Sequence, residues 1–233
     1  MKRFLTTLFL VVITIVICAQ PANDNTLKFL GHPVDGDKSL MEVHLKRKGF
    51  KYNEHYDCYK GKFNGKRVEV YISTNNQKID RVYVSFPETS ENLIRYEYNN
   101  LIRQFNDNGK YMSLSENVEI TEDEDISYEM TVKNKRYEAA FYLKLDTLAI
   151  RQEILTNCTE EQKEILANTD FNNLENLSSE DFNKIKFIII KLIGKLSESL
   201  TGEVWFTIHE NYGKYQIGLY YDNLNNRPNG EDL

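Results

Sequence analysis

The sequence predicts an α+β fold in which antiparallel β-hairpins pack against helices, with about six to eight strands and about four or five helices. Short runs alternate apolar and polar residues, which is typical of strands with one buried face. Turn dipeptides such as Asn64-Gly65 join neighbouring runs. Longer segments repeat apolar residues at helical spacing between capping residues and glycines. Because helices and hairpins alternate along the chain, we also expect a repeated helix-then-hairpin unit.

The first helix is expected to begin at Lys38, where the Asp37 side chain can cap it, and to stop at Gly49. Its apolar face consists of Leu40, Met41, Val43 and Leu45. These positions predict a helix with one broad buried side.

Two strands follow, over Arg67–Ser73 and Arg81–Phe86, because valines and isoleucine alternate with polar or aromatic residues in both runs. The Asn64-Gly65 dipeptide favours a tight hairpin turn. An earlier strand from Cys58 to Phe63 is therefore expected to pair with Arg67–Ser73.

A second helix is expected over Leu93–Phe105. Its predicted apolar side carries Leu93, Tyr96, Leu101 and Phe105. After an acidic stretch, alternation predicts strands over Tyr128–Val132 and Arg136–Leu143, which would form a second hairpin around Asn134.

Two further helix starts carry capping patterns, Thr159 with Gln162 and Ser178 with Asp181. Residues 182–200 place an isoleucine, leucine or phenylalanine on nearly every turn. A helix that is apolar almost all round is expected to be buried on more than one side.

The last hairpin is expected to join Val204–His209 to Tyr215–Tyr221. Together these elements predict a single α+β domain over residues 20–233, with sub-units 26–88 and 89–233 as an alternative.

The amino terminus has the pattern of a cleavable export signal over residues 1–19, in which two basic residues precede an apolar run from Phe4 to Ile17. The run is shorter than the roughly 20 residues of a membrane span, so no span is expected in the mature chain. A retained anchor is the weaker alternative. Lipid attachment at Cys18 is also less favoured, because Ile17 is not the small residue that this attachment requires. We expect a periplasmic or secreted protein.

Removal of residues 1–19 takes away Lys2 and Arg3 and shifts the net charge from −6 to −8. An acidic chain repels phosphate backbones, so no nucleic acid is expected as a partner. Cys58 and Cys158 remain, and in an oxidising compartment they could form a disulfide. Two separate apolar thiols are an equally good interpretation.

Three segments resemble a group of uncharacterised exported bacterial proteins: Phe29–Gly36 with the helix that follows it, Lys48–Phe50 at the end of that helix, and the closing residues 220–233. The helix-then-hairpin arrangement is more loosely similar to the β-lactamase inhibitor protein and to small outer-membrane assembly lipoproteins. The resemblance implies a location and a fold, and it brings no active site with it.

No segment matches a known catalytic, cofactor or metal motif. The four histidines lack metal-ligand spacing, so neither a metal site nor a cofactor is expected. Two oxygen-rich segments could hold Ca²⁺ through carboxylate oxygens, but solvated loops are the favoured interpretation of both. The first contains Glu119, Glu122, Asp123, Glu124 and Asp125, and the second contains Asp222, Asn223, Asn225, Asn226, Asn229, Glu231 and Asp232.

Aromatic side chains are the most suggestive feature, because many of them fall on strand positions opposite the aliphatic ones. The candidate binding residues are Tyr71, Tyr83, Tyr142, Trp205 and Tyr220. A tyrosine-rich sheet face can stack on sugars or receive a peptide. Alternatively, helices cover this face and the rings belong to a second core.

The sequence thus favours a non-enzymatic binding or inhibitory module of the cell envelope whose partner is an envelope protein, a peptide or a glycan. A secreted or envelope hydrolase that draws carboxylates from separate loops is the alternative.

Overall fold

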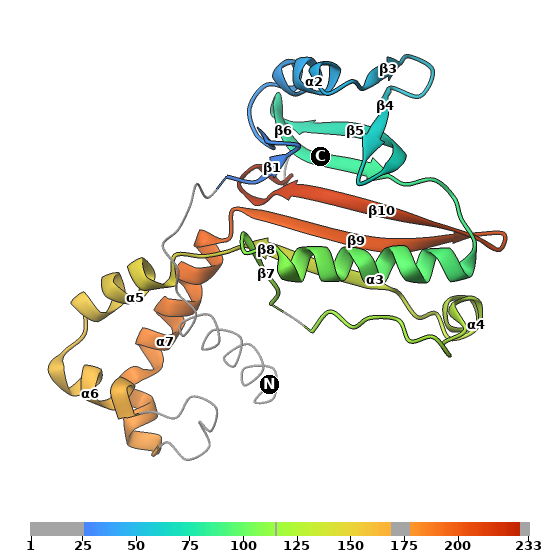
Figure 1. Cartoon of the computed structure of the whole chain (residues 1–233). Coiled ribbons are helices and arrows are strands. Elements are labelled where there is room, and N and C mark those ends of the chain that lie inside the picture. Colours follow the sequence, from blue (N-terminus) through green and yellow to red (C-terminus); the bar gives the residue numbers. More distant parts are fainter. Residues whose placement is uncertain (1–25, 115, 169–177, 229–233) are drawn as a thin grey trace. The chain divides into compact units, whose positions relative to one another are not determined.

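The computed structural model describes residues 26–114, 116–168 and 178–228. The predicted export signal, including Cys18, lies outside these residues, as do Asn229, Glu231 and Asp232. The chain divides into two compact units (Figure 1). Within the described ranges, the sheet unit comprises residues 26–114, 116–143 and 201–228, and the helical unit comprises residues 144–168 and 178–200.

The sheet unit contains an antiparallel sheet of eight strands, so the predicted α+β class is confirmed. Its strand order is β3-β4-β5-β6-β10-β9-β8-β7. The strands are β3 (Lys51–Asn53), β4 (Cys58–Phe63), β5 (Lys66–Asn75), β6 (Lys78–Ser85), β7 (Tyr111–Met112), β8 (Glu138–Leu143), β9 (Gly202–Asn211) and β10 (Lys214–Asn223). A separate pair joins β1 (Lys28–Phe29) to β2 (His32–Pro33). Strands from both sides of residue 88 therefore share one sheet.

Local turn chemistry determines two of the hairpins. Asn64 and Gly65 both have positive φ, 48° and 77°, as the tight turn between β4 and β5 requires. Tyr212 and Gly213 repeat this geometry between β9 and β10, with φ of 50° and 77°. The predicted first and last hairpins are confirmed by these pairings.

Helices cover one face of the sheet, which we call the core face. Helix α2 (Lys38–Arg47) begins at Asp37, whose carboxylate accepts a hydrogen bond from the Ser39 N–H. Helix α3 (Glu91–Asp107) runs beside β9 and β10 (Figure 1). Its ring of Tyr98 lies edge-on to Phe206 of β9 at a centroid distance of 5.2 Å.

The buried faces of both helices differ from the predicted ones. In α2 only Met41 and Leu45 are buried, four residues apart, whereas Leu40 is 60% exposed. In α3 Leu93 and Tyr96 are exposed. The residues of α3 that are buried are Ile94, Glu97, Tyr98, Leu101, Ile102 and Phe105. In both helices the buried residues are spaced three or four positions apart, as the helical repeat requires, whereas the predicted apolar faces also included residues outside this spacing.

The second predicted hairpin is wrong. Residues 126–131 form helix α4 (Ile126–Thr131), which begins where the Asp125 side chain accepts a hydrogen bond from the Tyr128 N–H. Buried Ile126 and partly buried Met130 attach the helix to the core at a spacing of four residues. The apolar alternation in this segment fits a strand locally, but the cap and this spacing favour the helix. Strand β8 pairs instead with β7 and β9.

The helical unit contains α5 (Thr147–Thr156), α6 (Glu160–Asn168) and α7 (Ser179–Ser199). The predicted capping box is present, because Thr159 and Gln162 exchange hydrogen bonds of 3.0 and 3.2 Å. Helix α7 buries Ile185, Ile189 and Leu196 along one stripe. Phe187 is 71% exposed, so the expected burial on more than one side is wrong for this helix. None of the helices in the described ranges is long and apolar enough to cross a membrane.

Of the cysteines in the described ranges, Cys58 is buried in the sheet unit and Cys158 is half-buried in the helical unit. Burial raises the pKa of the Cys58 thiol. The predicted disulfide between them remains a prediction.

Gly61 of β4 offers a test of the packing on the core face. A Cβ atom at this position would overlap the ring of Phe50, which is only 3% exposed. We expect Gly61→Ala to lower the free energy of unfolding by about 1–3 kcal/mol, because the buried ring cannot move aside freely. Urea unfolding measures this change. Gly109→Ala is the matched control, since no atom lies within 4 Å of the added methyl group, and equal effects of the two variants would contradict the predicted overlap.

Candidate binding surface on the second face of the sheet

Four of the candidate aromatic residues form one row across the sheet. Tyr71 of β5 lies opposite Tyr83 of β6, Tyr83 lies opposite Tyr220 of β10, and Tyr220 lies opposite Trp205 of β9. The ring centroids are 5.5, 4.7 and 4.0 Å apart in that order, and each pair is stacked. We call these four residues the aromatic ladder and their side of the sheet the ladder face.

The ladder face is opposite the core face because side chains alternate along each strand. Val70, Val82 and Val84 are fully buried, whereas the ladder rings between them are half-buried. The buried apolar residues of α2, α3 and α4 belong to the same core cluster as these valines.

Stacking leaves the ladder with two end faces, because the rings of Tyr83 and Tyr220 have a ring neighbour on both sides. At one end, Tyr71 donates a hydrogen bond of 2.8 Å to Glu69. At the other end, Trp205 lies opposite Ala140 of β8, whose methyl group is too small to cover an indole ring. The ladder therefore presents one large aromatic face beyond Trp205.

A cleft of about 790 Å³ lies at this end of the ladder. We call it the Trp205 cleft. It is lined by Asp80, Arg81, Glu116, Asn117, Glu138, Ala139, Ala140, Glu203, Trp205, Asp222, Arg227 and Pro228. The volume and the mixture of one aromatic ring with several polar groups are those of a small-molecule or sugar-sized site.

Asn117 forms one wall of the Trp205 cleft and caps the edge of the sheet. Its amide nitrogen donates to the carbonyl of Ala140 at 3.0 Å, and its amide oxygen accepts from the N–H of Ala140 at 3.2 Å. The side chain thus takes the hydrogen-bonding positions that a further strand would use along β8.

Asp222 holds the Trp205 end of the ladder in place. The Nε and a terminal nitrogen of Arg81 donate to its two oxygens at 2.6 and 2.7 Å, and the Trp205 indole N–H donates at 3.1 Å. Arg227 adds a contact of 3.1 Å. Burial acts to raise the pKa of Asp222, but the hydrogen bonds from Arg81 and Trp205 outweigh it and hold this pKa below its usual range. The indole N–H therefore donates to a carboxylate that is ionised at neutral pH.

Two small or polar neighbours shape the middle of the ladder. A Cβ atom at Gly218 would lie 2.9 Å from the Tyr220 hydroxyl, so the glycine allows that ring to lie close to the strand. The hydroxyl is 3.4 Å from Nε2 of His209. Burial beside Tyr83 raises the pKa of Tyr220 to about 12, so it stays a neutral donor at physiological pH.

Tyr142, the fifth candidate residue, does not join the ladder. It lies opposite Glu203, one row away from Trp205 on the ladder face. Burial and a hydrogen bond to Glu203 raise its pKa to about 12. Glu203 also binds Arg227 at 2.5 Å, so Tyr142 belongs to the charged row beside the ladder.

Two of the carboxylates that line the Trp205 cleft are poorly suited to act as the general acid of the hydrolase alternative. A general acid needs a carboxyl group whose pKa is raised, but the pKa of Asp222 is lowered. Glu203 is ion-paired with Arg227. Of the carboxylates that line the Trp205 cleft, Asp222 and Glu203 therefore both form ion pairs with arginines.

Several oxygens of the two candidate Ca²⁺ segments already bind other groups of the protein. In the acidic stretch, Glu119 pairs with Arg103, Glu124 accepts from Lys135 and Tyr137, and Asp125 caps α4. In the closing segment, Asp222 accepts hydrogen bonds from Arg81 and Trp205, and the Asn223 side chain accepts one from the Asn225 N–H. Within the described ranges, no group of three or more His, Cys, Asp and Glu side chains is placed to hold a metal ion.

Arg81, Asn117, Asp222 and Arg227 were not among the predicted binding residues. Arg81 and Asp222 had a usable signal, since each lies two positions from a ladder tyrosine and hence on the same face. Asn117 had none, because it reaches β8 from an irregular loop.

No protein-family model, curated protein or solved structure matches this chain. The fold therefore supplies no known site by similarity, and the ladder and its cleft are the basis for a functional proposal.

Proposed function

We propose that the chain is an exported, non-enzymatic binding module of the cell envelope whose Trp205 cleft receives a sugar ring of a glycan. The observation that supports this proposal is the aromatic end face of Trp205, which borders a cleft over the small side chain of Ala140. The C–H face of a sugar ring can stack on such an indole while its hydroxyl groups bind nearby polar side chains.

Rigidity supports the same function. The indole is held by stacking on Tyr220 and by its hydrogen bond to Asp222. A side chain that is already ordered loses little entropy when a ligand binds, so a single stacked ring can contribute useful affinity.

A peptide partner is less well supported at this cleft. Peptides often bind by adding a strand to a sheet edge, but Asn117 already occupies the backbone groups of Ala140 at the edge of β8. The export signal over residues 1–19 and the resemblance to exported bacterial proteins favour a periplasmic or secreted location.

Trp205 is the only tryptophan of the chain, so its fluorescence reports on the proposed site without labelling. We expect titration with a panel of neutral and acidic oligosaccharides to shift the emission of Trp205 for at least one of them. Trp205→Ala is expected to weaken that binding at least about 30-fold, as loss of a central aromatic contact does. Calorimetry measures the affinity of this variant, which has no tryptophan signal.

Tyr212→Ala is the matched control, because this ring lies at the tip of the β9–β10 hairpin and is 99% exposed. It should bind as the unmodified protein does. A panel without any ligand, or a glycan that Trp205→Ala binds equally well, would overturn the proposal.

A further inference from the structure

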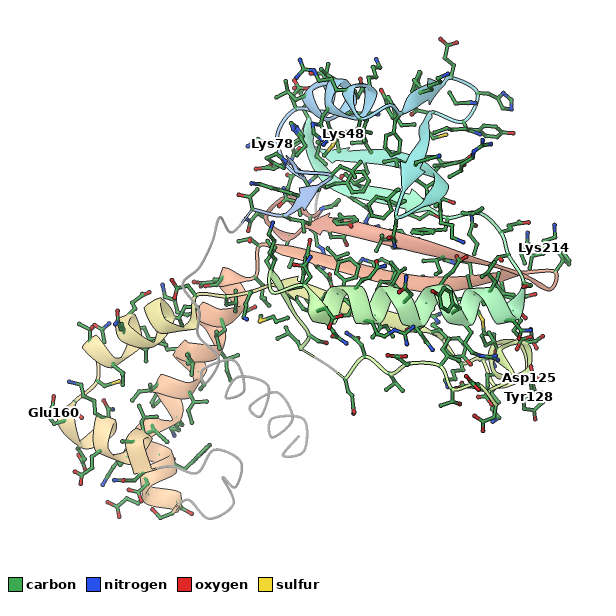
Figure 2. All side chains as sticks on the ribbon, viewed as in Figure 1. Lys48, Lys78, Asp125, Tyr128, Glu160 and Lys214 are labelled. Atoms are coloured by element: carbon green, nitrogen blue, oxygen red, sulfur yellow. The ribbon has the colours of Figure 1, made fainter. Side chains whose placement is uncertain are left out.

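A second cleft on the sheet is strongly basic. It has a volume of about 910 Å³ and is lined by residues of β3, β4, β5, β6 and β10 and by the residues that follow α2 and β6. Its cationic residues are Lys48, Lys51, Lys60, Lys62 and Arg67, and we call it the basic cleft. Glu69 is the one acidic residue of its lining. Figure 2 labels Lys48, which follows α2.

Most of this positive charge is unbalanced by the protein. Lys60 pairs with Glu69 at 2.7 Å. Lys48, Lys51, Lys62 and Arg67 are exposed, and none of them has an ion pair with another residue in the described part of the chain. The whole chain has a net charge of −6. Charges are screened beyond about 8 Å at physiological salt, so a ligand in the cleft would experience the local lysines rather than the distant acids.

In the basic cleft, the strand register places positively charged residues directly opposite each other on neighbouring strands. Lys51 lies opposite Lys60 across β3 and β4, and Lys62 lies opposite Arg67 across β4 and β5. Like charges in such cross-strand positions destabilise a sheet. An anion bound between the strands would offset this electrostatic destabilisation of the sheet. If these positions had only a structural role, neutral residues there would make the sheet more stable than lysine and arginine do.

The basic cleft is continuous with the ladder face. Arg67, Glu69 and Tyr71 follow one another at every second position of β5, so their side chains share one side of the sheet. Arg67 is four residues from Tyr71, which is about 13 Å along the strand. The Tyr71 hydroxyl donates to Glu69, which itself pairs with Lys60. A chain-like ligand on this face can therefore contact both the aromatic ladder and the basic cleft.

We propose that the basic cleft is a second subsite that binds the carboxylate groups of an acidic glycan. This inference rests on the proposed glycan binding at the Trp205 cleft and adds the class of glycan. Flexible, exposed lysines provide several point charges without a fixed set of buried donors, which suits repeated carboxylates along a polymer better than one tightly held phosphate.

The test compares acidic oligosaccharides with their methyl-esterified forms, which have the same backbone without the charge. Oligogalacturonate, oligomannuronate and hyaluronan fragments are suitable probes, each with its ester. For at least one of these pairs we expect the acid to bind the full chain about tenfold more tightly than the ester at low salt, and the difference to shrink as salt is added.

The double variant Lys62→Gln/Arg67→Gln should lose about tenfold in affinity for the acid and keep its affinity for the ester. Lys46→Gln/Arg47→Gln is the matched control. It removes the same charge from exposed positions of α2 outside the lining of the cleft, and it should bind both forms as before.

The outcomes separate the two proposals. Equal affinities for acid and ester, with loss of both in Trp205→Ala, would overturn the basic subsite and leave the proposed function intact. Absence of binding to every acid and ester would overturn the basic subsite, and it would overturn the proposed function as well if the neutral oligosaccharides also failed to bind. Tighter binding of single-stranded DNA or of anionic phosphatidylglycerol vesicles than of any acidic glycan would also overturn the assignment to glycan carboxylates.

Discussion

Replacing Asp222 with alanine is expected to lower the free energy of unfolding by about 3 kcal/mol, because removal of one member of a buried ion pair leaves its partners unsatisfied. The carboxylate is 2% exposed and accepts hydrogen bonds from Arg81, Trp205 and Arg227. Arg81 is 40% exposed, so water can solvate it in part and the loss should fall at the lower end for buried pairs. Chemical denaturation of the variant and of the unmodified protein measures the difference.

Glu119→Gln is the control for the Asp222 variant. It breaks the pair with Arg103, in which both side chains are about half exposed, at 50% and 42%. Such pairs contribute at most about 1 kcal/mol. If both variants lost the same small amount, the Asp222 cluster would not be the anchor of the ladder.

The pH dependence supplies a second signature of Asp222. Its pKa is lower in the folded protein than in the unfolded chain, so the ionised form stabilises the fold above the ordinary carboxyl pKa. This contribution is lost as the pH falls through the lowered folded-state pKa. The acid side of the stability profile should therefore be flatter in the Asp222 variant, as measured by denaturation at a series of pH values.

Phe206→Ala is expected to lower the free energy of unfolding by about 3–5 kcal/mol, the cost of removing a large buried ring. Phe206 is completely buried on the core face. Its ring is stacked with Phe141 at 6.2 Å and lies edge-on to Tyr98 at 5.2 Å. Removal of the ring would leave a cavity between the sheet and α3. The neighbouring aromatic rings are packed against one another there, so they cannot move far enough to fill it.

Trp205→Ala is the matched comparison, since this residue precedes Phe206 and its side chain projects from the opposite face. It should cost clearly less than Phe206→Ala, because the half-buried indole loses mainly one ring stack, about 0.5–1.5 kcal/mol, and one hydrogen bond. Urea unfolding of the two variants tests the assignment of the faces. Equal losses would mean that the ladder is a second core, as the alternative interpretation of the sequence held.

Several elements could be predicted because their signals are local. Asn64-Gly65 can adopt the positive φ angles of a tight turn more readily than most dipeptides, and the strands on both sides follow from alternation. The caps at Asp37 and at Thr159 were likewise readable, because each involves residues within one helical turn.

The incorrect predictions concern segments whose local sequence patterns either conflict with one another or carry no information about burial. The segment at Tyr128 alternates as a strand does, yet its burial is decided by Ile126 and Met130, which pack against distant parts of the chain. The exposed side of α7 could not be derived from its composition, because every turn carries apolar residues and only the contacts with α5 and α6 select one stripe.

The candidate site divides in the same way. Alternation placed Tyr71, Tyr83, Trp205 and Tyr220 on the non-core positions of their strands. It could not set their register, so stacking of the four rings was not foreseeable. The cleft beyond Trp205 also depends on the pairing of β8 with β9, which places Ala140 opposite the indole.

By itself, the sequence determined the strand alternation, the tight turns, the helix caps and the side of each strand on which the aromatic residues lie. These depend on residues close together in the chain, whose preferences do not require knowledge of the fold. The tertiary structure alone decided the strand order, the continuous ladder, the Asp222 cluster and the lining of both clefts. Each of these joins residues far apart in the sequence, and Arg81 meets Asp222 only because β6 pairs with β10.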